Sequence, residues 1–408
     1  MQTANFTDNH KRRWQFAKQF FQETEESHFW VDIHKFANSM TKTFFEITLN
    51  EEMIEYQKRE SYQRTQDRVD YRNGYYQRNF DTAFGPIENI AIPRSRTGLF
   101  KPTIFEKYQR RQDCVNQSII NCFLLGVSTR NVKDVLKPLL GVNISASTVS
   151  NVTKSVDSLV KEFHHRPLLD EYQFLFLDGI NISVRSGSKS VKKTVLAAYG
   201  ITLFGQRELI DFRIVKSESK DACEAFLKHL YNRGFKGKHL KLIITDGGKG
   251  IIAALPFAYP EIKHQRCWFH KLQNIQKFLK KKDQKQVIKD LQKIYNAISR
   301  TKALDAFKTF RKIYSKSYPQ VIASIDQDLE ELLNFLTIPI KQDYRIFIRK
   351  RIRTTNVIER SFREIRRRTK PMSCFNNDDS LQRIIYAVFY RLNNNWKDKP
   401  LKQFTQFI

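Results

Sequence analysis

Cysteine is scarce in this chain of 408 residues, and the five cysteines that are present form no recognisable pair. They are odd in number and widely scattered, and no two of them stand at the CxxC spacing. Small secreted domains that depend on disulfides carry even numbers of cysteines at regular spacings. The cysteine content therefore favours a reduced, cytoplasmic setting.

Long apolar runs are also missing from the sequence. No stretch approaches the roughly 18 to 20 apolar residues that a helix needs to cross a bilayer. The first residues, Met1–Arg13, lack the apolar segment of a signal peptide. We therefore expect no membrane-spanning segment, no cleaved leader and no membrane partner.

Acidic residues are few compared with basic ones. Asp and Glu number 42 against 71 Lys and Arg, which gives a formal net charge of +29. With 41% hydrophobic residues, the chain is long enough for roughly two or three folded domains. Such an excess of positive charge on a folded chain indicates a polyanionic partner, and nucleic acid is the obvious candidate. We therefore expect a cytoplasmic, nucleoid-associated protein.

An acidic residue, Asp178, interrupts the otherwise apolar stretch Tyr172–Arg185. A carboxylate inside a sheet is costly unless it is hydrogen-bonded, ion-paired, metal-bound or protonated. Because Gly179 follows it, this stretch taken alone favours a hairpin with a type I′ turn. A second apolar run, Leu240–Thr245, ends at Asp246 and leads at once into a helical pattern, which suits a parallel strand better. Together, the two aspartates suggest one shared site.

Alternating and apolar patterns between Tyr172 and Lys277 predict five strands, with one helix before the fourth strand and another that ends at Pro256. The strands are expected at 173–184, 194–204, 208–215, 240–245 and 262–266. Three meandering strands followed by two in βαβ order are typical of a ribonuclease H-like mixed sheet. In that order the fourth strand lies beside the first, so Asp178 and Asp246 are expected to be neighbours.

The N-terminal part begins with a polar, helical pattern and continues with a predicted hairpin, Tyr75–Ala83 and Ile87–Pro93. The basic turn at the end of this hairpin either contacts phosphates or is a solvated surface. Three helical patterns follow; Ser128 is placed to cap the second, and Ser145 to open a third over Ala146–Val160. This order fits a DNA-binding helix-turn-helix, and it fits a helical bundle equally well.

Beyond Lys277 the sequence becomes lysine-rich, and its apolar spacing predicts an all-helical insertion. Between Arg345 and Lys370 there are 11 Lys and Arg residues against two acids. Such a run is usually a solvated surface. Here the apolar stripe of a predicted helix leaves three arginines together on another face, which suits phosphate binding: Arg360, Arg363 and Arg367.

Glu359 stands in this basic helix at the boundary between the apolar stripe and the arginines. Asn356 and Glu359 have the spacing of a capping box, in which the glutamate bonds back to the Asn356 backbone. The position equally suits a metal ligand that meets DNA. Cys267 and His270 have the Cys-x-x-His spacing that begins some zinc sites, but apart from His264 no further ligand stands at a suitable spacing.

Several motifs resemble those of the Mutator-type transposases of bacterial insertion sequences. They stand at Phe176–Ile180, at Ile244–Gly247, at Gln265–His270 and at Arg353–Arg360, with upstream matches at Gly126–Arg130 and Ser145–Ser150. The resemblance runs from about Asn73 to Tyr390. It implies an α/β ribonuclease H-like core with a mixed five-stranded sheet, an all-α insertion and a mainly helical N-terminal DNA-binding region.

The resemblance also implies a function. Such a protein binds the terminal inverted repeats of its insertion sequence, cleaves DNA there and transfers the strand into target DNA. Asp178, Asp246 and Glu359 would hold two Mg²⁺ ions, with Mn²⁺ as a substitute, and the chemistry favours this choice because hard cations prefer carboxylate oxygens. Cys267 and His270 would support the site.

Double-stranded DNA is thus the expected partner, and a homodimer or higher homo-oligomer on DNA is the expected assembly. We assign DNA contacts to eight residues: Arg130, Ser147, Thr148, Arg353, Asn356, Arg360, Arg363 and Arg367. Two alternatives stay open. One is a ribonuclease H-like nuclease that cuts without strand transfer. The other is a transposase-derived DNA-binding regulator, against which the presence of all three acids counts.

The sequence is accordingly divided into five segments. They are an N-terminal helical region with a small hairpin at 1–100, a helix-turn-helix-like DNA-binding region at 101–166, the first part of the ribonuclease H-like core at 167–277, a helical insertion at 278–350, and the Glu359 helix with the C-terminal helices at 351–408.

Overall fold

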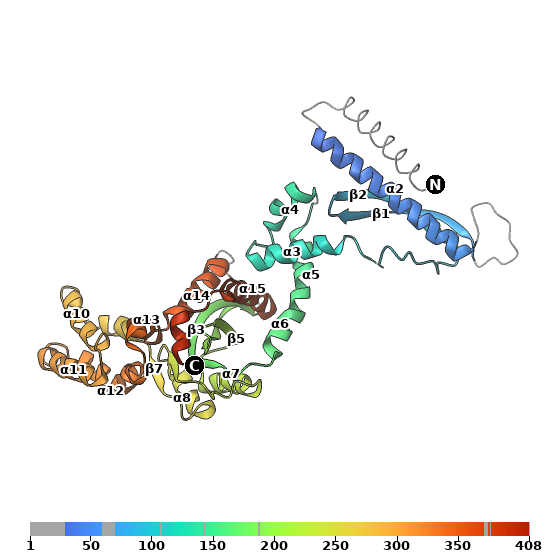
Figure 1. Cartoon of the computed structure of the whole chain (residues 1–408). Coiled ribbons are helices and arrows are strands. Elements are labelled where there is room, and N and C mark those ends of the chain that lie inside the picture. Colours follow the sequence, from blue (N-terminus) through green and yellow to red (C-terminus); the bar gives the residue numbers. More distant parts are fainter. Residues whose placement is uncertain are drawn as a thin grey trace. The chain divides into compact units, whose positions relative to one another are not determined.

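The structure is a computed structural model, and it describes residues 29–58, 70–106, 108–141, 143–186, 188–370, 374–375 and 377–407. The expectations for the first 28 residues lie outside these ranges. The chain forms two compact units (Figure 1). The N-terminal unit comprises residues 1–123 and 127–154, and the C-terminal unit comprises residues 124–126 and 155–408.

A long helix and a β-hairpin share one core in the N-terminal unit. The elements are α2 (Phe29–Gln57), β1 (Arg72–Thr82) and β2 (Gly85–Ser95). The two strands pair in antiparallel register, so the predicted hairpin is confirmed. Apolar side chains from one face of the hairpin, among them Phe80, Ile90 and Ile92, are buried with Leu49 of α2.

Three short helices form a second core in the same unit: α3 (Asp113–Leu125), α4 (Val132–Leu140) and α5 (Ala146–Val152). Val115, Val132 and Val149 contribute one buried side chain from each helix. Ser145 caps α5 as predicted, because its hydroxyl accepts the N–H of Thr148 at 3.1 Å. The Ser128 hydroxyl accepts the N–H of Asn131 at 3.2 Å, in the turn that leads into the second helix, and α4 itself begins at Val132, after Asn131.

The third helix of this region is interrupted, so the prediction of one continuous helix is wrong. After α5 ends at Val152, a 3₁₀ turn intervenes before α6 (Val156–His165) begins. The Thr153 hydroxyl donates to the Ser150 carbonyl at 3.1 Å. Side chains of Ser, Thr and Asn, which are dense here, compete with the backbone bonds of a helix and weaken it.

A mixed five-stranded sheet forms the centre of the C-terminal unit. Its strands are β3 (Tyr172–Ser186), β4 (Lys189–Thr202), β5 (Arg207–Val215), β6 (Leu242–Thr245) and β7 (His264–Arg266). They lie in the order β5-β4-β3-β6-β7. Strand β3 pairs antiparallel with β4 and parallel with β6, so the fourth predicted strand does lie beside the first.

Strand β3 passes directly through the Asp178-Gly179 dipeptide, so the interpretation of that dipeptide as a hairpin turn is wrong. Asp178 stands opposite Ala197 of β4, and Gly179 stands opposite Leu196. The chain turns back only after Ser186, where β3 and β4 join. The Asp178 side chain therefore lies within a paired strand instead of at an exposed loop tip.

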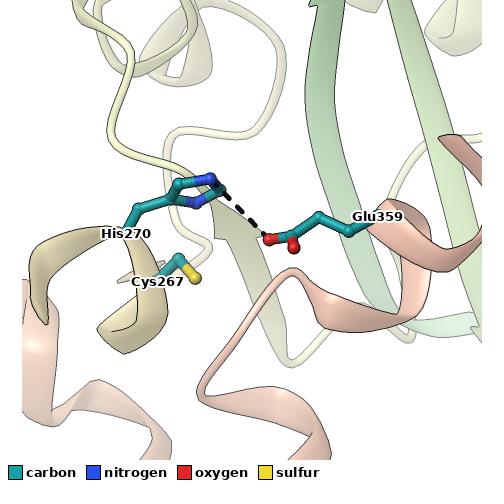
Figure 2. Close-up of side chains that lie close together, drawn as sticks. All are labelled: Cys267, His270 and Glu359. Atoms are coloured by element: carbon teal, nitrogen blue, oxygen red, sulfur yellow. Dashed lines mark ion pairs between the residues drawn. The ribbon is translucent and has the colours of Figure 1, made fainter. Parts of the chain in front are cut away.

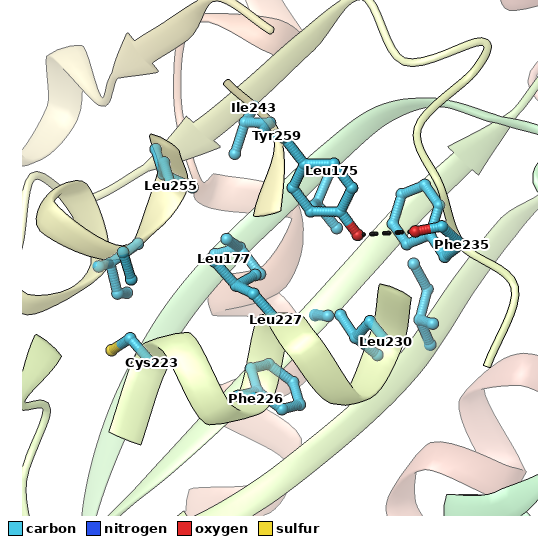
Figure 3. Close-up of a cluster of buried hydrophobic side chains, with 14 of the residues drawn as sticks. Leu175, Leu177, Cys223, Phe226, Leu227, Leu230, Phe235, Ile243, Leu255 and Tyr259 are labelled. Carbon is cyan, nitrogen blue, oxygen red and sulfur yellow. Dashed lines mark hydrogen bonds between the residues drawn. The ribbon is translucent and has the colours of Figure 1, made fainter. Parts of the chain in front are cut away.

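Helices cover both faces of this sheet: α7 (Lys220–Asn232) and α8 (Lys249–Ala258) on one face, α14 (Asn356–Thr369) and α15 (Asp378–Trp396) on the other. Leu175 and Leu177 of β3 are buried against α7 and α8 (Figure 3). On the opposite face, Phe212 of β5 packs on Phe389 of α15, with ring centroids 5.1 Å apart. Pro256 lies inside α8, which continues past it to Ala258, so the predicted end of this helix is two residues too early.

Between β7 and α14 the chain is helical throughout, as predicted. The main elements are α9 (Trp268–Gln276), α10 (Gln284–Tyr295), α11 (Arg300–Tyr314), α12 (Pro319–Leu333) and α13 (Gln342–Ile352). The Trp268 indole donates to the Leu332 carbonyl at 2.7 Å, and the Gln265 amide donates to the same oxygen at 3.0 Å. These bonds attach the insertion to the edge of the sheet. No helix in the described ranges is long and apolar enough to cross a membrane.

Candidate active site

Asp178 and Asp246 lie side by side because of the register between two parallel strands. Leu177 of β3 pairs with Thr245 of β6, and an aspartate follows each of these residues. Backbone amides orient both side chains. One oxygen of Asp178 accepts the N–H of Gly179 at 2.8 Å, and one oxygen of Asp246 accepts the N–H of Gly248 at 2.9 Å.

Asp178 is 5% exposed, and its burial is the main reason why its pKa is raised from 3.8 to about 8. The negative charge of Asp246 raises this pKa further, and Glu359 and Glu218 act in the same direction. The N–H of Gly179 opposes the shift. Three other carboxyl groups therefore lie close enough to Asp178 to raise its pKa. A cluster of this kind holds protons or a cation at neutral pH, because adjacent buried carboxylates repel one another.

Glu359 enters this cluster from the first turn of α14. The residue before that helix is Thr355, and its hydroxyl donates to Oε1 of Glu359 at 2.9 Å. The capping-box interpretation is therefore wrong: Thr355, not Asn356, occupies the N-cap position, and the Glu359 carboxylate accepts from a hydroxyl instead of from the Asn356 backbone. The Thr355 side chain, which is fully buried, thus holds one oxygen of Glu359 in place.

Cys267 and His270 both contact Thr355, and they lie beside the Glu359 side chain (Figure 2). The Thr355 N–H donates to the Cys267 sulfur at 3.3 Å, and the Thr355 hydroxyl lies 3.4 Å from Nδ1 of His270. The His270 ring also approaches Glu359, with 3.7 Å between Nε2 and Oε1. One potential ligand atom from each of Cys267, His270 and Glu359 lies within 4.8 Å of the others, and Asp178 and Asp246 are not part of that group.

The basic face predicted on α14 is present. Arg360, Arg363 and Arg367 are exposed, and they line a groove of about 810 Å³ in the C-terminal unit. Three more arginines line the same groove: Arg207, Arg351 and Arg391. Asn356 is exposed at the start of the same helix.

The remaining predicted DNA contacts lie elsewhere. Arg353 is separated from the exposed arginines, because its guanidinium donates to the Tyr295 carbonyl at 2.9 Å and packs over the Tyr295 ring. Arg130 and Ser147 are exposed in the N-terminal unit, and the half-buried Thr148 hydroxyl accepts a hydrogen bond from the Ser145 hydroxyl at 3.0 Å.

Two residues of the site escaped the sequence analysis. Glu218, just before α7, contributes the fourth carboxyl group, and Thr355 links Glu359 to Cys267 and His270. The only sequence signal for Glu218 is indirect: glycines stand close after both aspartates, and Gly179 and Gly248 leave space beside the acids. Thr355 had no signal of its own.

The molecule is thus a mixed α/β protein whose sheet brings acidic side chains together in a unit that also carries an arginine-lined groove. The profile of one protein family, described as "Transposase, Mutator family", matches residues 15–399. The chain belongs to the Mutator family of transposases.

Named relatives cover most of the chain. It is 32% identical over 363 residues to the transposase for insertion sequence element IS256 in transposon Tn4001 of Staphylococcus aureus, which covers 88% of this chain and 90% of the relative. It is 32% identical over 380 residues to the transposase for IS905 of Lactococcus lactis, covering 92% and 93% of the two chains. It is 34% identical over 338 residues to the transposase for IS406 of Burkholderia multivorans, covering 82% and 84%.

Proposed function

We propose that this chain is a DNA transposase with a ribonuclease H-like catalytic core. It binds the terminal inverted repeats of its own insertion sequence, cleaves DNA at their ends and joins the released 3′ end to target DNA in the nucleoid. The observation that carries the proposal is that Asp178 and Asp246 follow a paired position of two parallel strands and Glu359 of α14 lies close enough to raise the pKa of Asp178, in a chain of a transposase family. The strand order of the sheet supports the ribonuclease H-like assignment.

The residues at this site fit divalent metal ions. Asp178 is almost fully buried among like charges, and no lysine, arginine or histidine in the described ranges forms an ion pair with it, so a bound metal ion would relieve the repulsion. Carboxylate oxygens are the ligands that Mg²⁺ prefers, and Mn²⁺ accepts the same set. Asp178, Asp246 and Glu359 would hold two such ions, which when bound activate an attacking oxygen and stabilise a leaving one.

Residues of the chain itself orient the three carboxylates. Backbone amides of Gly179 and Gly248 orient the two aspartates, and the Thr355 hydroxyl orients Glu359. Cys267 and His270 hold Thr355, which is the supporting role proposed for them. Their own contacts explain why a Cys-x-x-His spacing occurs here without a complete set of four zinc ligands.

DNA would be held by separate surfaces on the two units. The arginine-lined groove of the C-terminal unit offers guanidinium groups to phosphates, and the helices α3 to α5 of the N-terminal unit offer a helix-turn-helix arrangement to the terminal repeats. Joining two ends of one element requires two active sites close together, so we propose that the protein acts as a homodimer or higher homo-oligomer on DNA.

One assay tests the function. Purified protein is mixed with Mg²⁺ and DNA that carries the terminal repeats, and the products are scored for joined molecules as well as cuts. Joined products are expected, because a released 3′-hydroxyl can replace water as the attacking group at the same site. Cuts without joining would favour a nuclease, and specific binding without cutting would favour a DNA-binding regulator.

A further inference from the structure

Gly179 follows Asp178 directly, Gly248 stands two residues after Asp246, and the backbone angles of these two glycines do not require glycine. Gly247, between Asp246 and Gly248, differs from them because its φ is +97°. Gly179 lies in the paired part of β3 and is not among the residues with positive φ, and Gly248 has φ of −56°. Side-chain-bearing residues adopt such angles readily. The reason for glycine at these positions is therefore space, not backbone conformation.

Glu218 occupies that space. A Cβ atom on Gly248 would lie 2.0 Å from Oε1 of Glu218, and a Cβ atom on Gly179 would lie 3.1 Å from Oε2. A Cβ atom on Gly250 would lie 2.1 Å from the backbone oxygen of Glu218. Three glycines from two different parts of the chain thus leave room for one glutamate.

The Glu218 carboxylate is directed at the acidic cluster. The Cβ position on Gly248 that is 2.0 Å from Oε1 of Glu218 is also 3.3 Å from Oδ1 of Asp246, so the two acids share one edge of the site. Oε1 of Glu218 is buried and has no hydrogen-bond partner within the described part of the chain. A buried carboxylate oxygen without a donor is costly unless it binds a proton or a cation.

Helix α7 fixes this position. The next residue, Ser219, caps α7 through its side chain, which accepts the N–H of Ala222 at 3.3 Å. The backbone at Glu218 is therefore held at the start of this helix. Burial and the charge of Asp246 raise its pKa from 4.5 to about 7, which is consistent with a carboxyl group that lacks a counter-charge.

We propose that Glu218 is a fourth carboxylate of the metal site and binds, together with Asp246, one of the divalent cations. The inference rests on the proposed function, because it assumes that the acidic cluster holds metal ions. It assigns a purpose to Gly179, Gly248 and Gly250: their lack of a side chain lets the Glu218 carboxylate reach the cations from the N-terminal end of α7.

The first test measures Mn²⁺ binding to the full-length protein by isothermal titration calorimetry, with no DNA present. Glu218→Gln keeps the size of the side chain and removes its charge. We expect its Mn²⁺ affinity to fall by about tenfold or more. Glu224→Gln on the same helix, whose carboxylate pairs with Lys220 at 3.5 Å, is the matched control and should bind Mn²⁺ as the wild type does.

The second test uses the close approach to Gly248. Gly248→Ala leaves every acid in place but puts a methyl group where the Glu218 carboxylate lies, so Mn²⁺ affinity should fall by a similar factor. In a Glu218→Ala background the same Gly248→Ala change should have little further effect, because the group that it displaces is already gone. Additive losses of affinity in the double variant would overturn the inference.

Asp178→Asn separates this inference from the proposed function. If Asp178→Asn loses Mn²⁺ binding while Glu218→Gln binds as tightly as the wild type, Glu218 is not a ligand and the three-acid site stands. If Asp178→Asn also binds Mn²⁺ normally, the metal assignment itself fails. Loss of affinity in Asp178→Asn and Glu218→Gln, with Glu224→Gln unchanged, supports both.

Discussion

Asp178 is the residue on which the proposed chemistry depends most directly, together with Asp246 and Glu359. Replacement of any one of the three by its amide, for example Asp178→Asn, removes a charged ligand and little volume. We expect cleavage to fall by at least about a hundredfold, which corresponds to about 2.7 kcal/mol of transition-state stabilisation. Binding to terminal-repeat DNA should be unchanged in a gel-shift assay.

The Glu359→Gln variant distinguishes a metal ligand from a capping residue most clearly, because glutamine would serve in a capping box as well as glutamate does. The structure contains no such box at this helix start, so the variant should keep its melting temperature and lose cleavage. Near-normal joining of DNA ends by Glu359→Gln would contradict the assignment of this residue as a metal ligand.

The raised pKa of Asp178 also predicts how stability depends on pH without metal. The folded protein holds the Asp178 proton up to a pKa of about 8, whereas the unfolded chain releases it near 3.8. The folded state therefore binds more protons between these values, and the free energy of unfolding falls as pH rises through this window. In EDTA, the melting temperature should fall from about pH 6 to about pH 8, and less so in Asp178→Asn.

Divalent metal should reverse this trend, because a bound cation favours the ionised carboxylates. We expect the increase in melting temperature on addition of Mg²⁺ to be larger at about pH 8 than at about pH 6. Glu224→Gln should follow the wild type in both conditions. An equal Mg²⁺ effect at the two pH values would argue against metal binding at Asp178.

At the scale of elements, the start of α14 is positioned by contacts from a distant part of the chain. Cys267 and His270 contact Thr355, and the Thr355 hydroxyl donates a hydrogen bond to Glu359. Thr355→Val keeps the shape of the buried side chain and removes that donor. We expect cleavage, and the apparent affinity for Mn²⁺, to fall about tenfold.

Thr355→Ser, which retains the hydroxyl, should keep most of the cleavage activity and most of the affinity for Mn²⁺. Because the Thr355 side chain makes no cap bond to the helix backbone, the valine variant should melt near the wild-type temperature. A large loss of stability in Thr355→Val, with no change in Mn²⁺ dependence, would show that the threonine serves the fold and not the position of Glu359.

The helices α3 to α5 form an element with its own buried core, inside a unit that is compact by itself. We expect the fragment of residues 1–154 to bind terminal-repeat DNA, with an affinity that falls steeply as salt is raised. Fluorescence anisotropy against repeat and random duplexes at several salt concentrations measures this. Equal affinity for both duplexes would mean that the repeats are recognised elsewhere.

At the scale of the whole molecule, the net charge of +29 is concentrated in part on the groove beside α14. Arg363→Ala and Arg367→Ala should each weaken the binding of any DNA to a similar degree. Each should also lower the slope of the logarithm of the binding constant against the logarithm of salt concentration by about one, because each removes one cation from a phosphate. Arg353→Ala is a useful contrast. Its guanidinium is bound to Tyr295, so we expect reduced stability with little change in the salt slope.

Local patterns in the sequence were enough to predict the strands and the helical insertion. Alternation of side chains predicts a strand from neighbours in the chain, without knowledge of distant contacts. The exposed arginine face of α14 followed from helical spacing in the same way. These features depend on neighbours in the chain, which the sequence displays directly.

Tertiary structure alone decided which distant groups meet. Asp178-Gly179 has the sequence of a turn, but pairing with β4 holds it in a strand. Glu218 reaches the acids because three glycines allow it, and Thr355 orients Glu359 because the insertion returns the chain to Cys267. Such contacts join residues far apart in sequence, and their energies depend on packing and burial, which no local pattern contains.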